Sequence, residues 1–419
     1  MTSRPLHAVL LPPVAGGGRL LAALAAALEG TGPAILPLDP GLPAARLRAV
    51  LDAFAPAAVE TPDGIRHLGA REPGGQPPAL AGGQASDAGI AVVIATSGST
   101  GPPKGVALSA AALRASAASS LTRIGARPGQ RWLCCLPGFH VAGLQVLVRS
   151  LLAGADPLIT DRADPATITA AAGAGCAFVS LVPTQLRRLL DAGAPLAGFD
   201  TILLGGAAPP AGLLADAREA GARVVTTYGM SETCGGCVYD GRPLEGVRLR
   251  ITAADQPAPP GTAGRIGITG PVLLSGYWPR GSRAATDRDG WFWTSDLGSL
   301  DSDGRLTVRG RADDVINTGG EKVIPGEVEA VLGTIRGVRD VVVIGVPDSE
   351  WGEVVTAVVV PADPAAPPDL AALRAGARDS LPGYAAPRRM LVMADIPVLP
   401  SGKPDRLALR RAGQRQREN

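Results

Sequence analysis

Short, continuous hydrophobic runs recur through the middle of the chain and alternate with stretches of helical composition. Residues 90–95 (IAVVIA) form one such run, which is typical of a strand buried on both faces. Further runs lie at residues 132–136, 176–182, 201–204 and 224–227. Helical stretches such as residues 183–192 and 211–220 separate them. This alternation predicts an α/β fold in which mainly parallel sheets are flanked by helices.

The pattern changes on both sides of this region. Residues 1–85 read as Ala-rich helical pieces broken by Pro and Gly. From about residue 245, short strands and turns (VRLRI, RIGIT, VLLSGYW, WFWTSD) predict a small, barrel-like part. Beyond Arg311 the pattern is that of a small α+β unit. We therefore predict a large N-terminal domain over residues 1–312 and a small C-terminal domain over residues 313–419.

Composition narrows the possible classes of function. The 40 basic and 38 acidic residues give a net charge of +2, which lacks the basic excess that nucleic-acid binding requires. No uninterrupted apolar stretch reaches the roughly 18 residues of a membrane span. A glutamate follows the apolar run at residues 20–28, where a signal peptide would carry small residues. Five cysteines, with Cys234 and Cys237 as a lone CxxC pair, predict neither a disulfide framework nor a zinc site, so we expect a cytoplasmic protein.

Lysine occurs at only three positions, Lys104, Lys322 and Lys403. All the other residues among the 40 Lys and Arg are arginine. The compact ammonium group of lysine does what a planar guanidinium cannot, so a lysine in this arginine-rich chain is expected to have a specific task. All three lysines lie in segments rich in glycine or serine. These segments are therefore the first candidates for chemistry.

Residues 96–105 (TSGSTGPPKG) follow an apolar run and precede a helical stretch at residues 109–124. Because no Gly-Lys-Ser/Thr ends it, the loop is not a Walker A motif. Its glycines allow close approach of a phosphate, its hydroxyls donate hydrogen bonds, and Lys104 can meet polyphosphate charge. A strand, a glycine loop and a helix in this order present backbone N–H groups to an anion. The alternative is an ordinary surface loop.

Two acidic motifs also follow predicted strands. Residues 228–233 (YGMSET) place Tyr228 where it could stack on a base and Glu232 where its oxygens could hold Mg²⁺. Asp296, in a Thr-Ser-Asp sequence, could accept both hydroxyls of a ribose. The alternatives are a strand-end turn with an incidental acid and a turn cap.

Other segments leave two interpretations open. Residues 311–314 (RADD) form a hinge or a solvated turn, and residues 401–406 (SGKPDR) form a loop in which Lys403 is functional or only solvated. His140 lies in apolar sequence, where it is either a satisfied core histidine or a catalyst. Arg149 marks a carboxylate pocket or faces solvent.

The motifs TSGSTGPPKG, YGMSET, TSD, GRADD with a Gly-Gly loop, and SGK occur in this order. The set resembles the adenylate-forming, AMP-dependent acyl-CoA synthetase/ligase family over residues 90–419. Within that family, LPGFHVAGLQVLVRS and YGMSETCGGCVYDG are similar to the o-succinylbenzoate–CoA ligases of menaquinone biosynthesis. The resemblance implies that a small carboxylate joins the α-phosphate of ATP with release of diphosphate. The CoA thiol then attacks the acyl-adenylate and releases AMP.

The resemblance also implies roles for particular residues. The loop would cradle phosphates, Glu232 would hold Mg²⁺, and Lys403 would stabilise the transition state of adenylation. The implied ATP and AMP site comprises Thr96, Ser97, Gly98, Ser99, Thr100, Gly101, Lys104, Gly205, Gly206, Tyr228, Gly229, Met230, Ser231, Thr233, Asp296 and Arg311.

The same resemblance implies that the small C-terminal domain is mobile and swings about Asp313. This rotation would move Lys403 out of the active site. It would bring in a CoA tunnel formed by Gly319, Gly320, Lys322 and Trp351. The acyl pocket would contain His140, which is also a catalytic candidate, together with Gln145 and Arg149.

Only 95 residues precede Thr96, fewer than the family usually has, which fits a small aromatic acid better than a long fatty chain. The favoured acid is 2-succinylbenzoate. Three alternatives remain: another aryl or short acyl acid, loading of a carrier protein, and a nucleotide-binding relative without catalysis. Retention of the three lysines and Glu232 argues against the last. A homodimer is an expectation from the family alone.

Overall fold

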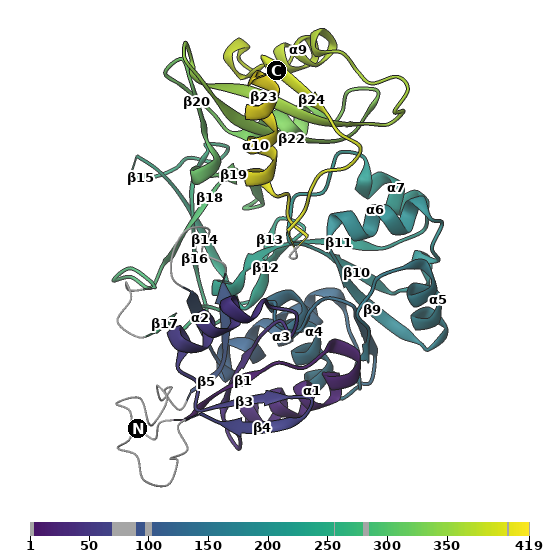
Figure 1. The fold of residues 1–419 in the computed structure, drawn as a ribbon, viewed down its shortest axis with the longest axis vertical. Coiled ribbons are helices and arrows are strands. Elements are labelled where there is room, and N and C mark those ends of the chain that lie inside the picture. The colour runs from purple at the N-terminus through teal and green to yellow at the C-terminus, as the bar shows by residue number, and fades with distance from the viewer. Residues whose placement is uncertain are drawn as a thin grey trace.

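The computed structural model describes residues 4–68, 89–96, 103–254, 256–279, 285–399 and 402–418. A large N-terminal part and a small C-terminal part are stacked along the longest axis of the molecule (Figure 1). The predicted α/β class is confirmed, as are the predicted strands between residues 90 and 227. Within the described residues, none of the helices has the length and the hydropathy needed to cross a bilayer.

The first sheet includes strands from the N-terminal region, where the sequence pattern predicts only helical pieces. Its order is β17-β6-β5-β2-β1-β3-β4. The strands are β1 (Leu6–Val9), β2 (Ala34–Pro37), β3 (Ala58–Thr61), β4 (Gly64–His67), β5 (Ile90–Thr96), β6 (Lys104–Ser109) and β17 (Gly276–Trp278). The prediction for residues 1–85 misses the first four of them, because β1 and β2 are four residues long, almost wholly buried and without polar alternation. The helices in this region are α1 (Pro13–Glu29) and α2 (Ala44–Phe54).

The second sheet carries the predicted alternation of strands and helices, in the order β13-β12-β11-β10-β9-β7-β8. The strands are β7 (Arg131–Cys134), β8 (Leu158–Ile159), β9 (Cys176–Leu181), β10 (Thr201–Leu204), β11 (Val224–Met230), β12 (Gly235–Tyr239) and β13 (Arg242–Pro243). Neighbours from β7 to β11 pair in parallel, and β12 and β13 are antiparallel. Helices α1, α3 (Ala110–Ile124) and α4 (Val141–Ala153) pack between the two sheets. Helices α5 (Pro165–Gly173), α6 (Pro183–Asp191) and α7 (Leu213–Glu219) cover the other face of the second sheet.

The segment around the glycine loop differs from the prediction. Strands β5 and β6 form an antiparallel hairpin in which the Thr96 hydroxyl donates to the Lys104 carbonyl oxygen over 3.0 Å. Helix α3 begins only after β6, with Ser109 as its N-cap. The strand–loop–helix order is therefore wrong, because the apolar residues 106–108 after Lys104 continue as a buried strand. The loop residues Ser97, Gly98, Ser99, Thr100 and Gly101 lie outside the described residues.

Residues 248–311 form the antiparallel part, whose described strands pair in the order β15-β14-β16-β18-β19. They are β14 (Arg248–Ala253), β15 (Gln256–Pro257), β16 (Gly264–Thr269), β18 (Phe292–Leu300) and β19 (Leu306–Arg311). Strand β17 instead joins the first sheet beside β6. It does so because Trp278, which is 1% exposed, packs in the core around Phe54 and donates its Nε1–H to the Phe54 carbonyl oxygen.

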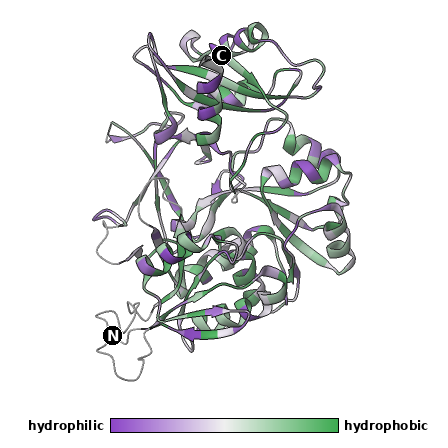
Figure 2. Cartoon of the chain, in the orientation of Figure 1, coloured by the Kyte–Doolittle hydropathy of each residue, from purple (hydrophilic) through white to green (hydrophobic). Residues whose placement is uncertain are grey.

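The C-terminal part is the predicted α+β unit. A sheet in the order β21-β20-β23-β22, with β24 beside β23, separates two apolar cores. The strands are β20 (Ile316–Thr318), β21 (Glu321–Val323), β22 (Val338–Asp348), β23 (Gly352–Pro361) and β24 (Arg389–Val392). Helices α8 (Pro325–Leu332) and α9 (Leu370–Arg378) cover one face, and α10 (Arg406–Glu418) covers the other. Figure 2 shows hydrophobic strands inside both parts and hydrophilic residues on the helices.

A short turn, η3 (Ala312–Asp314), joins β19 to β20 and thereby connects the two parts. Beside it, Arg309 of β19 forms an ion pair of 2.8 Å with Glu327 of α8. Arg406 of α10 lies 3.5 Å from Asp314. Of these two contacts, the pair of Arg309 and Glu327 links the two parts, while the domain boundary at residues 312 and 313 remains a prediction.

Candidate active site

Three candidate nucleotide-binding residues meet where the second sheet adjoins the antiparallel part. The register of β18 and β19 places Asp296 opposite Arg311, with their side chains 3.6 Å apart. The Tyr228 hydroxyl on β11 donates to Asp296 Oδ2 over 2.8 Å. Asp296 is 9% exposed and lies within a strand, so the turn-cap alternative is wrong. Burial and the Asp296 carboxylate raise the pKa of Tyr228, which therefore remains a hydrogen-bond donor.

Gly205 and Gly206 follow β10 at the sheet edge that carries Tyr228. Gly205 lies so close to the Thr227 hydroxyl that a Cβ atom would clash, and Gly206 has a φ of +90°. Gly229 likewise has no room for a side chain against β12. Because β10 and β11 are parallel neighbours, their carboxyl ends share one edge, which is where open α/β sheets bind ligands.

The turn after β11 holds Glu232. It is a single 3₁₀ turn, η2 (Ser231–Thr233). Thr233 Oγ1 accepts a hydrogen bond from the Met230 N–H and donates to the Gly235 carbonyl oxygen over 2.7 Å. Thr233 thus fixes the turn, whereas Glu232 remains partly exposed toward β17.

Lys104 and Glu232 both contact the side chain of Tyr277. The Lys104 ammonium lies 3.4 Å from the centre of this ring, and the Tyr277 hydroxyl donates to Glu232 Oε1 over 3.3 Å. Tyr277 is on β17, which β6 holds in antiparallel register. Strand β17 therefore brings together charged residues from two motifs that are distant in the sequence.

Gln145 and Arg149 lie one helical turn apart on α4, with 2% and 5% of their surface exposed. The alternative in which Arg149 faces solvent is therefore wrong. Its guanidinium donates to the hydroxyls of Ser120 and Ser180 over 3.4 and 3.2 Å and stacks 4.4 Å from the Trp132 ring centre. Among the residues that the structure describes, no carboxylate forms an ion pair with Arg149. Burial lowers the pKa of Arg149, although the neighbouring Tyr239 and Cys134 side chains oppose this shift.

Two tyrosines at this site belong to no motif that the sequence predicts as functional. Tyr277 contacts Lys104, and the buried Tyr239 hydroxyl lies 2.7 Å from Ser120 Oγ, beside Arg149. Tyr228, Tyr239 and Tyr277 are three of only four tyrosines in the chain. That rarity is a signal of the same kind as the three lysines, and it would have selected these residues.

His140 is the N-cap residue of α4, and its Nε2 is buried without a hydrogen-bond partner among the described residues. Burial lowers the pKa of His140, the Asp39 carboxylate opposes this shift, and the Lys403 ammonium adds to it. The imidazole is therefore neutral at pH 7. A neutral ring with an unpaired nitrogen does not match the satisfied core histidine of the alternative interpretation.

Replacement of His140 by glutamine is expected to change how stability depends on pH. Because folding holds the pKa of His140 below its ordinary value of 6.5, the unfolded chain binds the proton first as the pH falls. Wild-type stability should therefore decrease from about pH 6.5 down to the lower folded-state pKa and recover as the pH rises. The His140→Gln variant should lose less over this window in urea unfolding. His7 is present in both proteins, so superimposable pH profiles would contradict the expectation.

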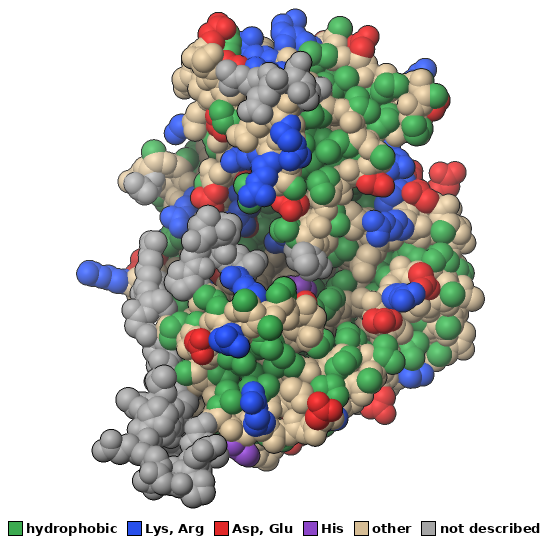
Figure 3. All heavy atoms as spheres, viewed as in Figure 1, with side chains coloured by type: hydrophobic (Ala, Val, Ile, Leu, Met, Phe, Trp, Pro, Cys, Tyr) green, Lys and Arg blue, Asp and Glu red, His purple; other side chains and the backbone are tan. Residues whose placement is uncertain are grey.

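Lys403 reaches the N-terminal part from the loop between β24 and α10. Gly402, with a φ of +78°, packs against Val182, the N-cap residue of α6. The Lys403 ammonium is near enough to His140 to lower the pKa of that imidazole. Figure 1 shows this loop descending toward the second sheet, and Figure 3 shows Lys and Arg side chains around the hollow between the two parts. Such a hollow attracts polyanions.

Gly319 and Gly320 form the turn between β20 and β21, with φ values of +60° and +88°. A two-residue hairpin of this kind needs positive φ at both positions. Gly319 lies against the Trp351 ring, where a Cβ atom would come within 2.8 Å of Cε3. The Arg388 guanidinium lies 3.7 Å from the Trp351 ring centre, and Lys322 is exposed on β21.

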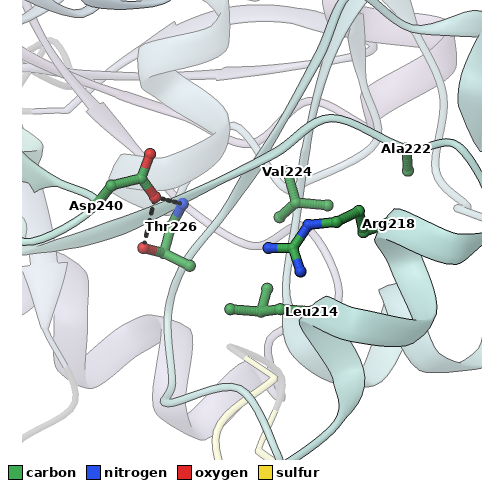
Figure 4. A pocket seen from close by; sticks show the side chains of 6 residues that line it. All are labelled: Leu214, Arg218, Ala222, Val224, Thr226 and Asp240. Atoms are coloured by element: carbon green, nitrogen blue, oxygen red, sulfur yellow. Dashed lines mark hydrogen bonds between the residues drawn. The ribbon is translucent and has the colours of Figure 1, made fainter.

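A separate pocket of about 360 Å³ lies beside α7 and β11. Its lining residues are Leu214, Arg218, Ala222, Val224, Thr226 and Asp240. Figure 4 shows Asp240 accepting two hydrogen bonds from Thr226, with the Arg218 side chain on the other side of the pocket. None of the candidate site residues lines it, so this pocket is not part of the site described above.

The carboxylate of Glu232 fits a Mg²⁺ ion that takes its other ligands from the phosphates of a nucleotide and from water. In the described parts of the chain, no group of three or more His, Cys, Asp or Glu residues could hold a metal ion. Burial raises the pKa of the Cys234 and Cys237 thiols, that of Cys237 to about 12, so both are neutral. Oε2 of Glu232 has no hydrogen-bond partner among the described residues. Mg²⁺ is usually held by one or two carboxylates together with phosphate oxygens and water.

The AMP-binding enzyme family matches residues 19–278, and the C-terminal domain of AMP-binding enzymes matches residues 327–403. The chain belongs to the AMP-binding enzyme family, which confirms the resemblance of its motifs. The chain is an AMP-forming acid–CoA ligase that works through an acyl-adenylate.

Three known proteins are similar to this chain over most of its length. The probable 2-succinylbenzoate–CoA ligase of Mycobacterium tuberculosis is 46% identical over 342 residues, which cover 79% of this chain and 86% of that protein. The feruloyl-CoA synthase of an Amycolatopsis species is 35% identical over 334 residues, which cover 75% and 68%. The Bacillus subtilis o-succinylbenzoate CoA synthetase, in complex with its acyl-adenylate intermediate, has a TM-score of 0.79 and 26% identity over 98% of this chain and 89% of that one.

Proposed function

We propose that the acid activated by this ligase is 2-succinylbenzoate. Relatives with this activity in their names support the proposal, and the observation that carries it is the buried Arg149 without an anionic partner among the described residues. 2-Succinylbenzoate has two carboxylates, so one can be activated while the other pairs with the guanidinium. A buried charge is stabilised only when it is paired and hydrogen-bonded. His140 and Gln145, on the same helix, would complete the acyl pocket.

The nucleotide would lie across the edge formed by β10, β11 and β18. Gly205, Gly206 and Tyr228 would border the adenine, and the pair of Asp296 and Arg311 would bind the ribose hydroxyls. Lys104 would bind the β- and γ-phosphates together with the neighbouring loop, since an ammonium is a compact partner for polyphosphate. Glu232 would hold Mg²⁺, which when bound neutralises charge on the phosphates.

In the first half-reaction, a carboxylate oxygen attacks the α-phosphorus and diphosphate leaves. Lys403, on the loop that packs against Val182, would place its ammonium between the carboxylate and the α-phosphate. This charge would stabilise the transition state as negative charge builds on the phosphorus oxygens. The neutral His140 would border the reacting carboxylate without forming an ion pair with it.

In the second half-reaction, the C-terminal domain would rotate about Asp313. The turn at Gly319 and Gly320 would then replace the Lys403 loop and, with Lys322, border the pantetheine of CoA. Trp351 would lie near the CoA nucleotide. The thiolate attacks the acyl carbon and AMP leaves, which completes the thioester.

Replacement of Asp313 by proline is expected to slow thioester formation more than adenylation. Proline fixes φ and therefore resists the swing, while the orientation with the Lys403 loop against Val182 would serve adenylation. We expect a loss on the order of tenfold or more in the thioester step and less than about twofold in diphosphate release. Asp313→Ala is the matched control, because this side chain is 72% exposed and alanine leaves the backbone free. Equal losses in both half-reactions would contradict the hinge.

The proposed acid is tested by AMP release with MgATP, CoA and a panel of carboxylic acids. The matched control for 2-succinylbenzoate is 4-oxo-4-phenylbutanoate, which lacks only the ring carboxylate. We expect 2-succinylbenzoate to be preferred over this analogue and over ferulate. If ferulate or another single-carboxylate acid is preferred by tenfold or more, the acid assignment is wrong and the ligase class stands.

A further inference from the structure

We propose that Tyr277 is a positioning residue that holds Lys104 and Glu232 in place for MgATP. The inference rests on the proposed roles of Lys104 and Glu232, and it assigns a task to a residue that belongs to neither motif. One aromatic side chain contacts both charged groups, through its ring face and through its hydroxyl. It therefore fixes their separation before the nucleotide arrives.

The segment that carries Tyr277 is anchored on both sides. Successive residues of a strand point to opposite faces, so the burial of Trp278 in the core around Phe54 directs Tyr277 toward the other face. A few residues earlier, the Leu274 N–H donates to the Glu232 carbonyl oxygen over 2.8 Å. The backbone of Glu232 is thus tied to the same segment as its side-chain partner.

Lys104 reaches the ring because of strand register. Tyr277 lies opposite Val106 of β6, and Lys104 precedes Val106 by two positions, so it points to the same face. Diagonal neighbours of this kind are within reach of long and aromatic side chains. The ring covers one side of the ammonium and leaves N–H groups on the other side for phosphate oxygens.

The phenol also prevents mutual neutralisation of the two charges. A direct ion pair would occupy the ammonium and a metal-binding oxygen together. Among the described residues, Lys104 forms no ion pair, and Glu232 receives the neutral Tyr277 hydroxyl on Oε1 alone. Both charges therefore remain available, the cation to phosphate and the carboxylate to Mg²⁺.

The test measures nucleotide binding without any acid, by calorimetry with ATP in EDTA and with MgATP. Tyr277→Phe keeps the ring and removes the hydroxyl, so we expect binding of MgATP to weaken about tenfold and binding of metal-free ATP to stay within about twofold. Tyr277→Leu removes the ring as well, so metal-free ATP should also bind about two- to fivefold more weakly. Tyr384→Phe, on the C-terminal part, is the control and should match the wild type.

A double-mutant cycle separates positioning from a general structural role. In a Lys104→Ala background, Tyr277→Leu should cause no further loss in metal-free ATP binding, because the cation held by the ring is gone. An equal loss in both backgrounds, or normal MgATP binding by Tyr277→Phe, would overturn the proposal. A wrong assignment of the acid leaves all of these expectations unchanged, because no acid is present.

Discussion

Replacement of Lys403 by alanine is expected to lower the rate of acyl-adenylate formation by about 10²–10³-fold, the usual effect of losing one group that stabilises developing charge. In the structure, the loop that carries Lys403 packs on Val182, and the Lys403 ammonium contributes to the lowered pKa of His140, so Lys403 lies on the side of the N-terminal part. Diphosphate release with MgATP and 2-succinylbenzoate measures this step. Thioester formation from a supplied acyl-adenylate should be largely spared.

Lys322→Ala is the matched control for this prediction. Lys322 is an exposed lysine on the same domain, but it lies in the hairpin proposed for CoA. Its replacement should therefore leave diphosphate release unchanged and affect only the thioester step. Near-normal diphosphate release by Lys403→Ala would show that another group stabilises the adenylation transition state.

Replacement of Arg149 by methionine is expected to lower kcat/KM for 2-succinylbenzoate by at least about 30-fold, because loss of one partner from a buried charge pair costs about 2 kcal/mol or more. Methionine fills a similar volume and removes the charge. The variant should be as stable as the wild type or more stable, because burial disfavours the charged form of Arg149 in the folded chain. Thermal melting measures stability, and AMP release measures activity.

The acid lacking the ring carboxylate makes this prediction specific. Wild type and Arg149→Met should use 4-oxo-4-phenylbutanoate equally well, since that acid offers no second carboxylate to the guanidinium. A parallel loss with both acids would show that Arg149 supports the pocket without pairing with substrate. The KM for ATP serves as a further control and should not change.

Short sequence motifs are enough to predict many of the residues at the site. The loop that ends in Lys104, the motif around Glu232 and the loop of Lys403 each combine glycine or hydroxyl residues with a charge, and this combination is visible without a fold. By contrast, Tyr277 and Tyr239 have no local motif, because each acts on a residue that is distant in the sequence. Only their rarity in the composition points to them.

The fold likewise contains elements that the sequence predicts and elements that it does not. Buried strands of the second sheet are predictable, because each is an apolar run between helices. Strands β1 and β2 are not, because four buried residues beside an Ala-rich helix carry no periodic signal. The helix predicted at residues 109–124 is confirmed as α3, but the apolar residues 106–108 before it pair with β5 as a strand that was not predicted.

The family, the order of the motifs and the identity of most charged groups follow from the amino-acid sequence, because they depend on residue types at short spacing. Which of these groups meet follows only from the folded chain. Strand register pairs Asp296 with Arg311, strand β17 places Tyr277 between Lys104 and Glu232, and packing of α4 between two sheets buries Arg149. Contacts between distant segments depend on how sheets and helices pack, and no local pattern encodes that packing.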